Sequence, residues 1–152
     1  GLRIGEVANL RVEDIDSKNM RIFVRAGKGN KERYTILPKQ SLDMLREYWR
    51  KYRQHKRRGR IFLSESGKAI TVGVIREHFR KYRRKAKINE KATVHTLRHN
   101  FATDLIERGA TLIQVKELMG HSNIRSTMVY VHVADVKLDL ESPLDAFLKG
   151  EE

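Results

Sequence analysis

A glycine-rich turn between two short stretches of alternating side chains restricts the possible fold more than any other feature. The turn is Gly27-Lys28-Gly29-Asn30, and the stretches are Met20–Arg25 and Arg33–Leu37, which contain β-branched and aromatic residues. Alternation with a period of two is typical of a strand, and a short glycine-rich connection joins antiparallel neighbours. The sequence therefore predicts a β-hairpin, which Pro38 ends.

Most of the remaining chain has the periodicity of amphipathic helices, with apolar residues three and four positions apart. We expect helices over residues 2–10, 42–52, 71–82, 97–106, 111–119 and 128–133, and one short strand over 61–63. On this spacing, Tyr52, Tyr82 and Leu97 should face the core. The predicted fold class is α+β, mainly α: a helical domain with a small antiparallel β-sheet.

Length and residue content exclude several classes of protein. The chain has 152 residues, which suits one domain with a real core, and its 39% hydrophobic and 34% charged residues do not suit a disordered chain. It contains no cysteine, so a disulfide scaffold and a cysteine-ligated metal site are excluded. No apolar run approaches the roughly 20 residues that span a bilayer. We expect a soluble, cytoplasmic protein without a membrane partner.

The positive charge is concentrated in two clusters. The chain has 32 Lys and Arg against 19 Asp and Glu, a net charge of +13. Residues 46–60 and 76–91 each hold eight basic side chains, with one acid in the first range and two in the second. Such clusters favour a polyanionic partner, most commonly nucleic acid, whose phosphates would make binding dependent on salt. A basic helix on a membrane surface fits less well, because the aromatic residues have core spacing.

The last segment differs from the rest in charge and predicts a division of the chain. Residues 135–152 carry a net charge of −4, which leaves +17 on residues 1–134. We expect the first 134 residues to form one domain that begins inside a helix, because no N-cap precedes Gly1. In the tail, Ser142-Pro143 should begin a short helix that docks on its own domain or on a neighbour. Its docking residues would be Leu144, Phe147 and Leu148.

Histidine and arginine side chains gather in the segment His95-Thr96-Leu97-Arg98-His99. On a helix, positions 95, 98 and 99 share one face, which could bind an anion or a metal. A metal site would pair His95 and His99, with His121 as a third ligand. The glutamate of the zincin motif is missing and no carboxylate ligand is obvious nearby, so we expect neither a metal nor a cofactor. His121 follows Gly120 at a helix end, where free backbone N–H groups could hold a phosphate.

Several motifs that are weak separately occur in an informative order. They are Gly1-Leu2-Arg3-Ile4-Gly5-Glu6-Val7, the hairpin with Lys28, His95-Thr96-Leu97-Arg98-His99, Gly120-His121 and Tyr130. Over about residues 1–133 this order resembles the catalytic domain of the tyrosine recombinases, the phage integrase family, and especially its Xer type. The resemblance includes the whole hairpin motif at residues 27–33.

This resemblance implies an enzyme that breaks and rejoins DNA strands at a specific site. Tyr130 would attack a phosphate of the DNA and form a 3′-phosphotyrosyl intermediate. Lys28 would protonate the departing 5′-hydroxyl, with Lys31 as the competing lysine of the hairpin. His95 would assist proton transfer around the nucleophile.

The resemblance also implies how the phosphate would be held. Arg3 and Arg98 would bind its non-bridging oxygens, because a guanidinium fork fits a phosphate and keeps its charge. His121 would donate a hydrogen bond to the same phosphate. Glu6 would orient Arg3, and His99 would have a supporting role. Such a set stabilises phosphoryl transfer without Mg²⁺, and the phosphotyrosyl bond conserves the energy needed for rejoining.

The partners implied are double-stranded DNA, in the nucleoid, and further copies of the chain, in a tetramer formed through C-terminal helices. Two other functions remain open at this point. One is a type IB topoisomerase, which nicks and rejoins DNA with a similar residue set; the short spacing from His121 to Tyr130 favours the recombinase. The other is a DNA-binding module without activity.

Overall fold

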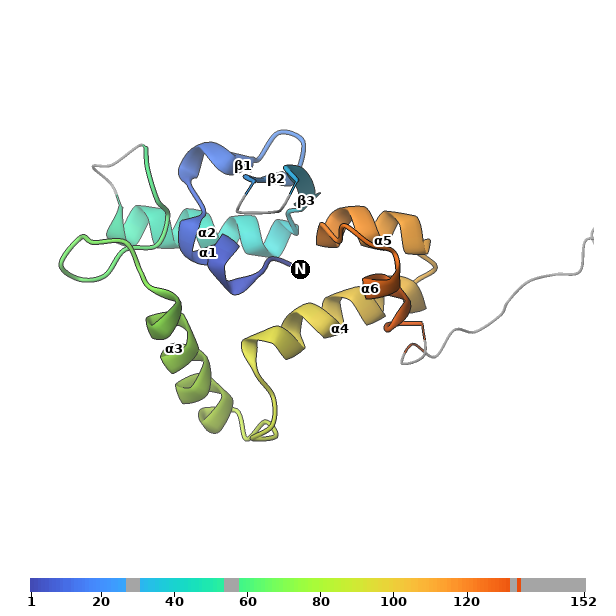
Figure 1. The fold of residues 1–152 in the computed structure, drawn as a ribbon. Helices are drawn as coiled ribbons and strands as arrows, with labels where there is room; N and C mark the ends of the chain where they lie inside the picture. The colour runs from blue at the N-terminus through green and yellow to red at the C-terminus, as the bar shows by residue number, and fades with distance from the viewer. Residues whose placement is uncertain (27–30, 54–57, 132–133, 135–152) are drawn as a thin grey trace, which may run out of the picture.

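The computed structural model describes residues 1–26, 31–53, 58–131 and 134, and is shown in Figure 1. In chain order the elements are α1 (Ile4–Asn9), the 3₁₀ helix η1 (Val12–Asp14), β1 (Ile15–Asp16), β2 (Arg21–Val24), β3 (Arg33–Ile36), α2 (Lys39–Tyr52), α3 (Val72–Lys85), α4 (Val94–Glu107), α5 (Leu112–Met119) and α6 (Arg125–Met128). The predicted fold class, mainly helical with a small antiparallel sheet, is confirmed. Among the described residues, no helix is long and apolar enough to cross a membrane.

The sheet has three antiparallel strands in the order β1-β2-β3. Ile22 pairs with Thr35 across β2 and β3, so the two predicted strands are neighbours; their turn at 27–30 lies outside the described residues. The predicted strand at 61–63 is wrong. In that region the described residues form isolated bridges, Arg11 with Arg60 and Leu63 with Ala69, because no neighbouring strand continues the ladder.

Two hydrophobic clusters form the core. The first joins the sheet to α2 and contains Leu10, Ile22, Leu37, Leu42 and Ile61. The second joins α4, α5 and the segment after α6 and contains Ala102, Ile106, Val115, Met119 and Tyr130. In Figure 1, α5 lies to the right of the sheet and α2 at about the same height, α6 and α4 lie below α5, and the N-terminus lies between α2 and α5. α5 also contacts β3, so the two clusters belong to one packed body.

Local hydrogen bonds explain why α4 and α5 begin and end where they do. The hydroxyls of Thr93 and Thr111 accept from backbone N–H groups three residues further on, which caps both N-termini. Gly109 follows α4 with φ 86°, and Gly120 ends α5 with φ 64°. Both glycines adopt the left-handed conformation that closes a helix. The caps therefore place His95 in the first turn of α4 and His121 directly after α5.

None of the residues of α3 belongs to either hydrophobic cluster. The helix has no buried side chain, contacts α1, and extends away from the remaining helices at the lower left of Figure 1.

Three aromatic or aliphatic residues expected in the core are instead exposed: Tyr52 (64%), Tyr82 (62%) and Leu97 (57%). Three-and-four spacing identifies one face of a helix, but the elements packed against that face decide which of its residues are covered.

Candidate active site

Three arginines converge on three consecutive carbonyl groups at the C-terminal end of α5. The pairs are Arg33 Nε with Leu118 O (2.9 Å), Arg98 Nη2 with Met119 O (2.6 Å) and Arg3 Nη2 with Gly120 O (2.9 Å). Carbonyl groups at a helix C-terminus lack intrahelical partners and carry partial negative charge, so they accept well from cations. The arginines come from β3, α4 and the residue that precedes α1. One turn thus brings together segments from the whole chain.

Gly120 is required at the centre of this turn for two reasons. Its backbone is left-handed, with φ 64° and ψ 46°. A Cβ atom at this position would also lie 2.7 Å from Nη1 of Arg33. The N–H of His121, the next residue, donates to the carbonyl of Lys116 at 3.1 Å. The arginines, rather than this expected free N–H group, therefore supply positive potential at the turn.

Glu6 lies between Arg3 and Arg33. Its Oε1 accepts from Nη1 of Arg3 at 3.0 Å and from Nη1 of Arg33 at 2.9 Å, while Oε2 accepts from Nη2 of Arg33 at 2.8 Å and from the backbone N–H of Arg3 at 2.7 Å. Burial raises the pKa of this carboxyl, but the hydrogen bonds from Arg33 and Arg3 outweigh burial, and its pKa lies below the ordinary value. Glu6 is therefore ionised and orients both guanidinium groups.

Arg33 was missed by the sequence reasoning as a site residue, although it ends the hairpin motif. Its side chain is only 7% exposed. Strand alternation contained the signal, because Arg33 has the same parity as Thr35 and Leu37, and both of those residues are buried. An arginine on the core face of a strand must have a charged or carbonyl partner.

Arg98 is the most buried of the three arginines, at 4% exposed for the whole residue. Nη1 donates to the carbonyl of Gly1, in addition to the bond from Nη2 to Met119. Burial lowers its pKa to about 10, Arg3 and Arg33 act in the same direction, and Glu6 and Tyr130 oppose them. Arg98 therefore remains charged at neutral pH.

His121 is neutral at neutral pH. Burial lowers its pKa to about 4, and the charges of Arg98, Arg3 and Arg33 act in the same direction. Its Nδ1 atom lies 3.0 Å from the hydroxyl oxygen of Thr127, which is also absent from the residues expected at the site. A neutral imidazole has one N–H donor and one acceptor, so this contact decides which nitrogen is available for other partners.

Tyr130 is 4% exposed and packs in the second hydrophobic cluster. Its ring lies against two histidines: His99, with centroids 5.3 Å apart and planes at 61°, and His121, with centroids 6.1 Å apart and planes at 17°. His95 contacts His99 at 4.4 Å between centroids. His99 therefore lies between Tyr130 and the exposed His95. Burial, His95 and Arg98 lower the pKa of His99, which favours its neutral form.

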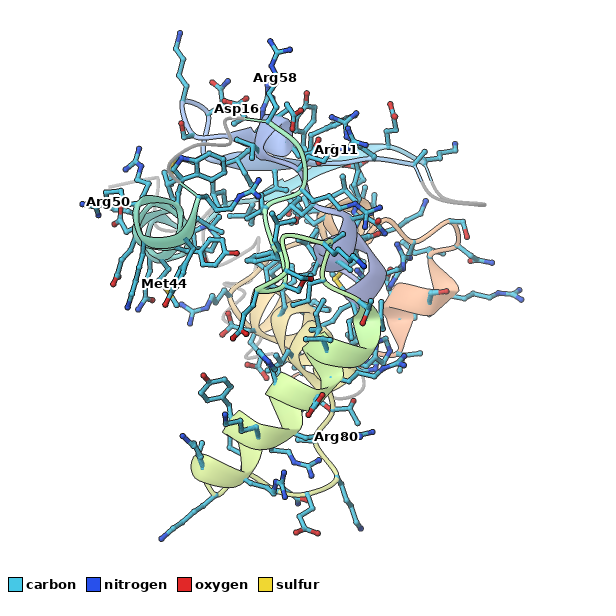
Figure 2. All side chains as sticks on the ribbon, turned by 90° about the vertical axis from the view of Figure 1, so that its left-hand side faces the viewer. Arg11, Asp16, Met44, Arg50, Arg58 and Arg80 are labelled. Atoms are coloured by element: carbon cyan, nitrogen blue, oxygen red, sulfur yellow. The ribbon has the colours of Figure 1, made fainter. Side chains whose placement is uncertain are left out.

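A cavity of about 500 Å³ opens between α1, α3 and α4. Its polar lining consists of Arg3, Arg76, Arg80, Arg83, Thr93, His95 and Arg98. Figure 2, with α3 towards the viewer, shows Arg80 projecting from α3 among side chains that extend outwards around this helix. The second basic cluster of the sequence thus reaches the same cavity as two of the arginines at the α5 turn.

Two further expectations concern the hairpin and metal binding. Lys28 lies outside the described residues, whereas Lys31 is described and exposed. In the part of the chain that the structure describes, no three His, Cys, Asp or Glu side chains are grouped as metal ligands. The rings of His95 and His99 are adjacent, and the ring of Tyr130 lies against His99.

Two relatives are similar over most of this chain. The tyrosine recombinase XerD of Lacticaseibacillus casei is 37% identical over 142 residues, which are 91% of this chain and 48% of that protein. The tyrosine recombinase XerD of Staphylococcus epidermidis is 40% identical over 139 residues, 88% of this chain and 46% of that protein. The chain thus spans about half the length of these relatives.

Solved structures have the same fold. A crystal structure of XerA recombinase superposes with a TM-score of 0.79 and 28% identity, covering 99% of this chain and 53% of that one. The structure of XerH site-specific recombinase bound to difH substrate, a pre-cleavage complex, superposes with a TM-score of 0.72 and 29% identity. That match covers 86% of this chain and 38% of that one. The phage integrase family matches residues 1–137. Together with the ordered motifs and the arginine-bound turn of α5, this match shows that the chain belongs to the phage integrase family of tyrosine recombinases.

Proposed function

We propose that this chain cleaves and rejoins DNA as the catalytic part of an Xer-type site-specific recombinase, with Tyr130 as nucleophile. The observation that carries the proposal is the arrangement at the end of α5. Arg3 and Arg98 bind adjacent carbonyl groups there, His121 follows them, and the Tyr130 ring stacks on His121. These are the groups that phosphoryl transfer by a tyrosine needs: a nucleophile, charge stabilisation and a hydrogen-bond donor.

In the proposed reaction the Tyr130 oxygen forms a bond to phosphorus while the bond from phosphorus to the 5′-oxygen breaks. Negative charge on the non-bridging oxygens is stabilised by Arg3 and Arg98. Arg3 uses two of its five side-chain N–H groups on Glu6 and Gly120, and Arg98 uses two on Gly1 and Met119, so others remain for the phosphate. His121 donates to the same phosphate. Arg3, Arg98 and His121 are held by these contacts before DNA binds, so the groups that stabilise charge need little reorganisation. The nucleophile Tyr130, which is 4% exposed, must leave its hydrophobic cluster to reach the phosphate.

Two proton transfers complete this proposal. The 5′-oxygen takes a proton from Lys28. The phenol of Tyr130 loses its proton with the help of His95, and the ring contacts indicate a path through His99, which touches both residues. A neutral His99 can accept a proton, and the exposed His95 can release one to solvent.

The proposed substrate is double-stranded DNA. The basic side chains of α3 line the cavity that also contains Arg3, His95 and Arg98, so a backbone bound along α3 would lead to the proposed reactive phosphate. A related site-specific recombinase, XerH, has been solved bound to its difH substrate. We place the protein in the cytoplasm, at the nucleoid where its substrate would be.

The proposal also divides the chain into a catalytic part, residues 1–134, and an acidic tail, residues 135–152, through which copies would associate into a tetramer. The family match ends at residue 137, close to this boundary, which supports the division. The opposite net charges of the two parts, +17 and −4, favour an attraction between a tail and a catalytic part.

A nicked half-site DNA, from which the short product strand is lost after cleavage, tests the function. The unsubstituted chain should form a covalent protein–DNA adduct, Tyr130→Phe should form none, and Tyr82→Phe, which changes an exposed tyrosine of α3, should leave adduct formation unchanged. Unchanged adduct formation by Tyr130→Phe would overturn the nucleophile.

The same assay, together with a relaxation and strand-exchange assay on supercoiled DNA with two sites, separates the other functions. DNA binding without any adduct would favour a non-catalytic DNA-binding module. If supercoiled DNA is relaxed but strands are never exchanged between two sites, the activity is that of a topoisomerase.

A further inference from the structure

Thr127 connects two proposed site residues although it lies outside the motifs identified from the sequence. It is on α6 and 0% exposed. Its hydroxyl oxygen lies 3.0 Å from Nδ1 of His121, and its backbone carbonyl accepts from the N–H of Tyr130 at 3.1 Å. One buried side chain therefore contacts the imidazole, while its backbone holds the segment that leads to the phenol.

The direction of the hydroxyl bond follows from counting protons. Thr127 is fully buried, so its hydroxyl donor needs a protein acceptor, and among the described residues its hydrogen-bond partner is His121 Nδ1. If Nδ1 carried the ring proton, it would donate to the hydroxyl and leave the hydroxyl proton without an acceptor. A buried donor without a partner costs about 1–3 kcal/mol. Donation from Thr127 to Nδ1 leaves both groups paired.

This direction determines the position of the ring proton. The imidazole is neutral, since burial and the charges of Arg98, Arg3, Arg33 and His95 oppose a second proton. A neutral ring has one proton, and if Nδ1 accepts a bond that proton must be on Nε2. We infer that Thr127 is a positioning residue that keeps His121 in the Nε2–H tautomer.

The inferred tautomer identifies the group that would donate a hydrogen bond to the DNA phosphate in the proposed function, namely Nε2–H of His121. An Nε2–H group can donate to a phosphate oxygen, whereas the other tautomer would present a lone pair to that oxygen and repel it. This reading of the donor rests on the proposed function, but the tautomer itself is a property of the protein without DNA.

Nitrogen NMR of the protein with ¹⁵N-labelled histidine measures the tautomer directly, because protonated and unprotonated ring nitrogens have different shifts. In the unsubstituted protein, His121 should be in the Nε2–H form, and Thr127→Ser, which keeps a hydroxyl, should preserve it. Thr127→Val has nearly the same shape but neither donates to Nδ1 nor accepts from it, so the bond that favours the Nε2–H form is lost and the fraction of this form should fall. The His121 signals are assigned by their loss in His121→Gln.

Either of two results overturns the inference: an Nδ1–H form in the unsubstituted protein, or an unchanged Nε2–H form in Thr127→Val. The first measurement needs no substitution, so it decides the matter even if Thr127→Val does not fold. Neither depends on DNA cleavage, so the tautomer can be wrong while the proposed function is right, and the reverse.

A second readout connects the tautomer to the reaction. In the half-site assay, Thr127→Val should lower the cleavage rate by about tenfold to a hundredfold with DNA affinity unchanged, and Thr127→Ser should restore most of the rate. A changed tautomer with an unchanged cleavage rate would show that His121 is not the phosphate donor. Equal losses in Thr127→Val and Thr127→Ser would attribute the effect to packing and overturn the positioning role.

Discussion

The C-terminal turn of α5 and the helix α3 use the same residue type in opposite ways. At the turn, Arg33 and Arg98 are almost inaccessible and donate to backbone carbonyls. On α3, which has no buried side chain, Arg80 and Arg84 are exposed. A buried arginine held by several hydrogen bonds can place a bound anion at one point. An exposed arginine attracts a polyanion over a longer range, and salt screens that attraction. The comparison indicates that α3 attracts DNA and the turn positions one phosphate.

The turn also retains an excess of positive charge. Among the described residues, Glu6 is the carboxylate bonded to Arg3 and Arg33, and the further hydrogen bonds of the three guanidinium groups go to backbone carbonyls. Burial, followed by this positive surrounding, lowers the pKa of both Arg98 and His121. The same excess of positive charge favours binding of an anion at the turn. The repulsion that lowers the pKa of Arg98 and His121 and the proposed affinity for phosphate therefore have the same origin.

The largest effect on stability should come from substituting Arg98. Arg98→Met leaves the carbonyls of Gly1 and Met119 without their donors and should lower the free energy of unfolding by about 2–4 kcal/mol. Arg80→Met on α3 is the matched control and should change it by less than about 0.5 kcal/mol. Urea unfolding followed by circular dichroism measures both. Similar losses for the two variants would remove the distinction between the turn and α3.

A smaller effect should appear when the pH is lowered. The pKa of His121 is about 4 in the folded chain, below the ordinary value of 6.5, so the unfolded chain binds this proton first. Stability should therefore fall as the pH decreases from about 7 to about 5. His121→Gln should reduce this fall, whereas His78→Gln, at an exposed position of α3, should not. Urea unfolding at both pH values tests this, and an equal fall in all three proteins would contradict it.

The smallest effect on stability should come from substitutions on α3, which should instead change the affinity for DNA. Replacing Arg80 and Arg84 together by glutamine should leave the unfolding free energy unchanged but weaken binding to duplex DNA. The slope of log affinity against log salt should decrease by about two, one for each lost phosphate contact. Fluorescence anisotropy at several salt concentrations measures the slope. An unchanged slope would show that these arginines do not contact the DNA backbone.

Local structure was largely predictable because its causes lie within a few residues. The caps Thr71 and Thr111 bond to N–H groups three residues further on, and Gly109 and Gly120 end helices through their own backbone conformation. The cap Thr93 was missed, so α4 begins at Val94 rather than at the predicted residue 97. The strands of the hairpin were predicted from alternation in the same way. Predictions that depended on distant neighbours failed, such as the core positions of Tyr52 and Tyr82 and the strand at 61–63.

In the candidate site, too, features that depend on neighbouring residues were predictable and contacts between distant segments were not. The sequence by itself determined the first five helices, the hairpin strands, the order of the motifs and hence the family. The helix predicted over 128–133 is wrong, because α6 spans Arg125–Met128 and the described residues 129–131 form turns. Only the tertiary structure decided that Arg33 bonds Glu6, 27 residues away, and Leu118, 85 residues away, and that Thr127 faces His121. The physical reason is that a side chain's partner across such distances exists only once packing has brought the two segments together, whereas a cap or a turn is formed by neighbours along the chain.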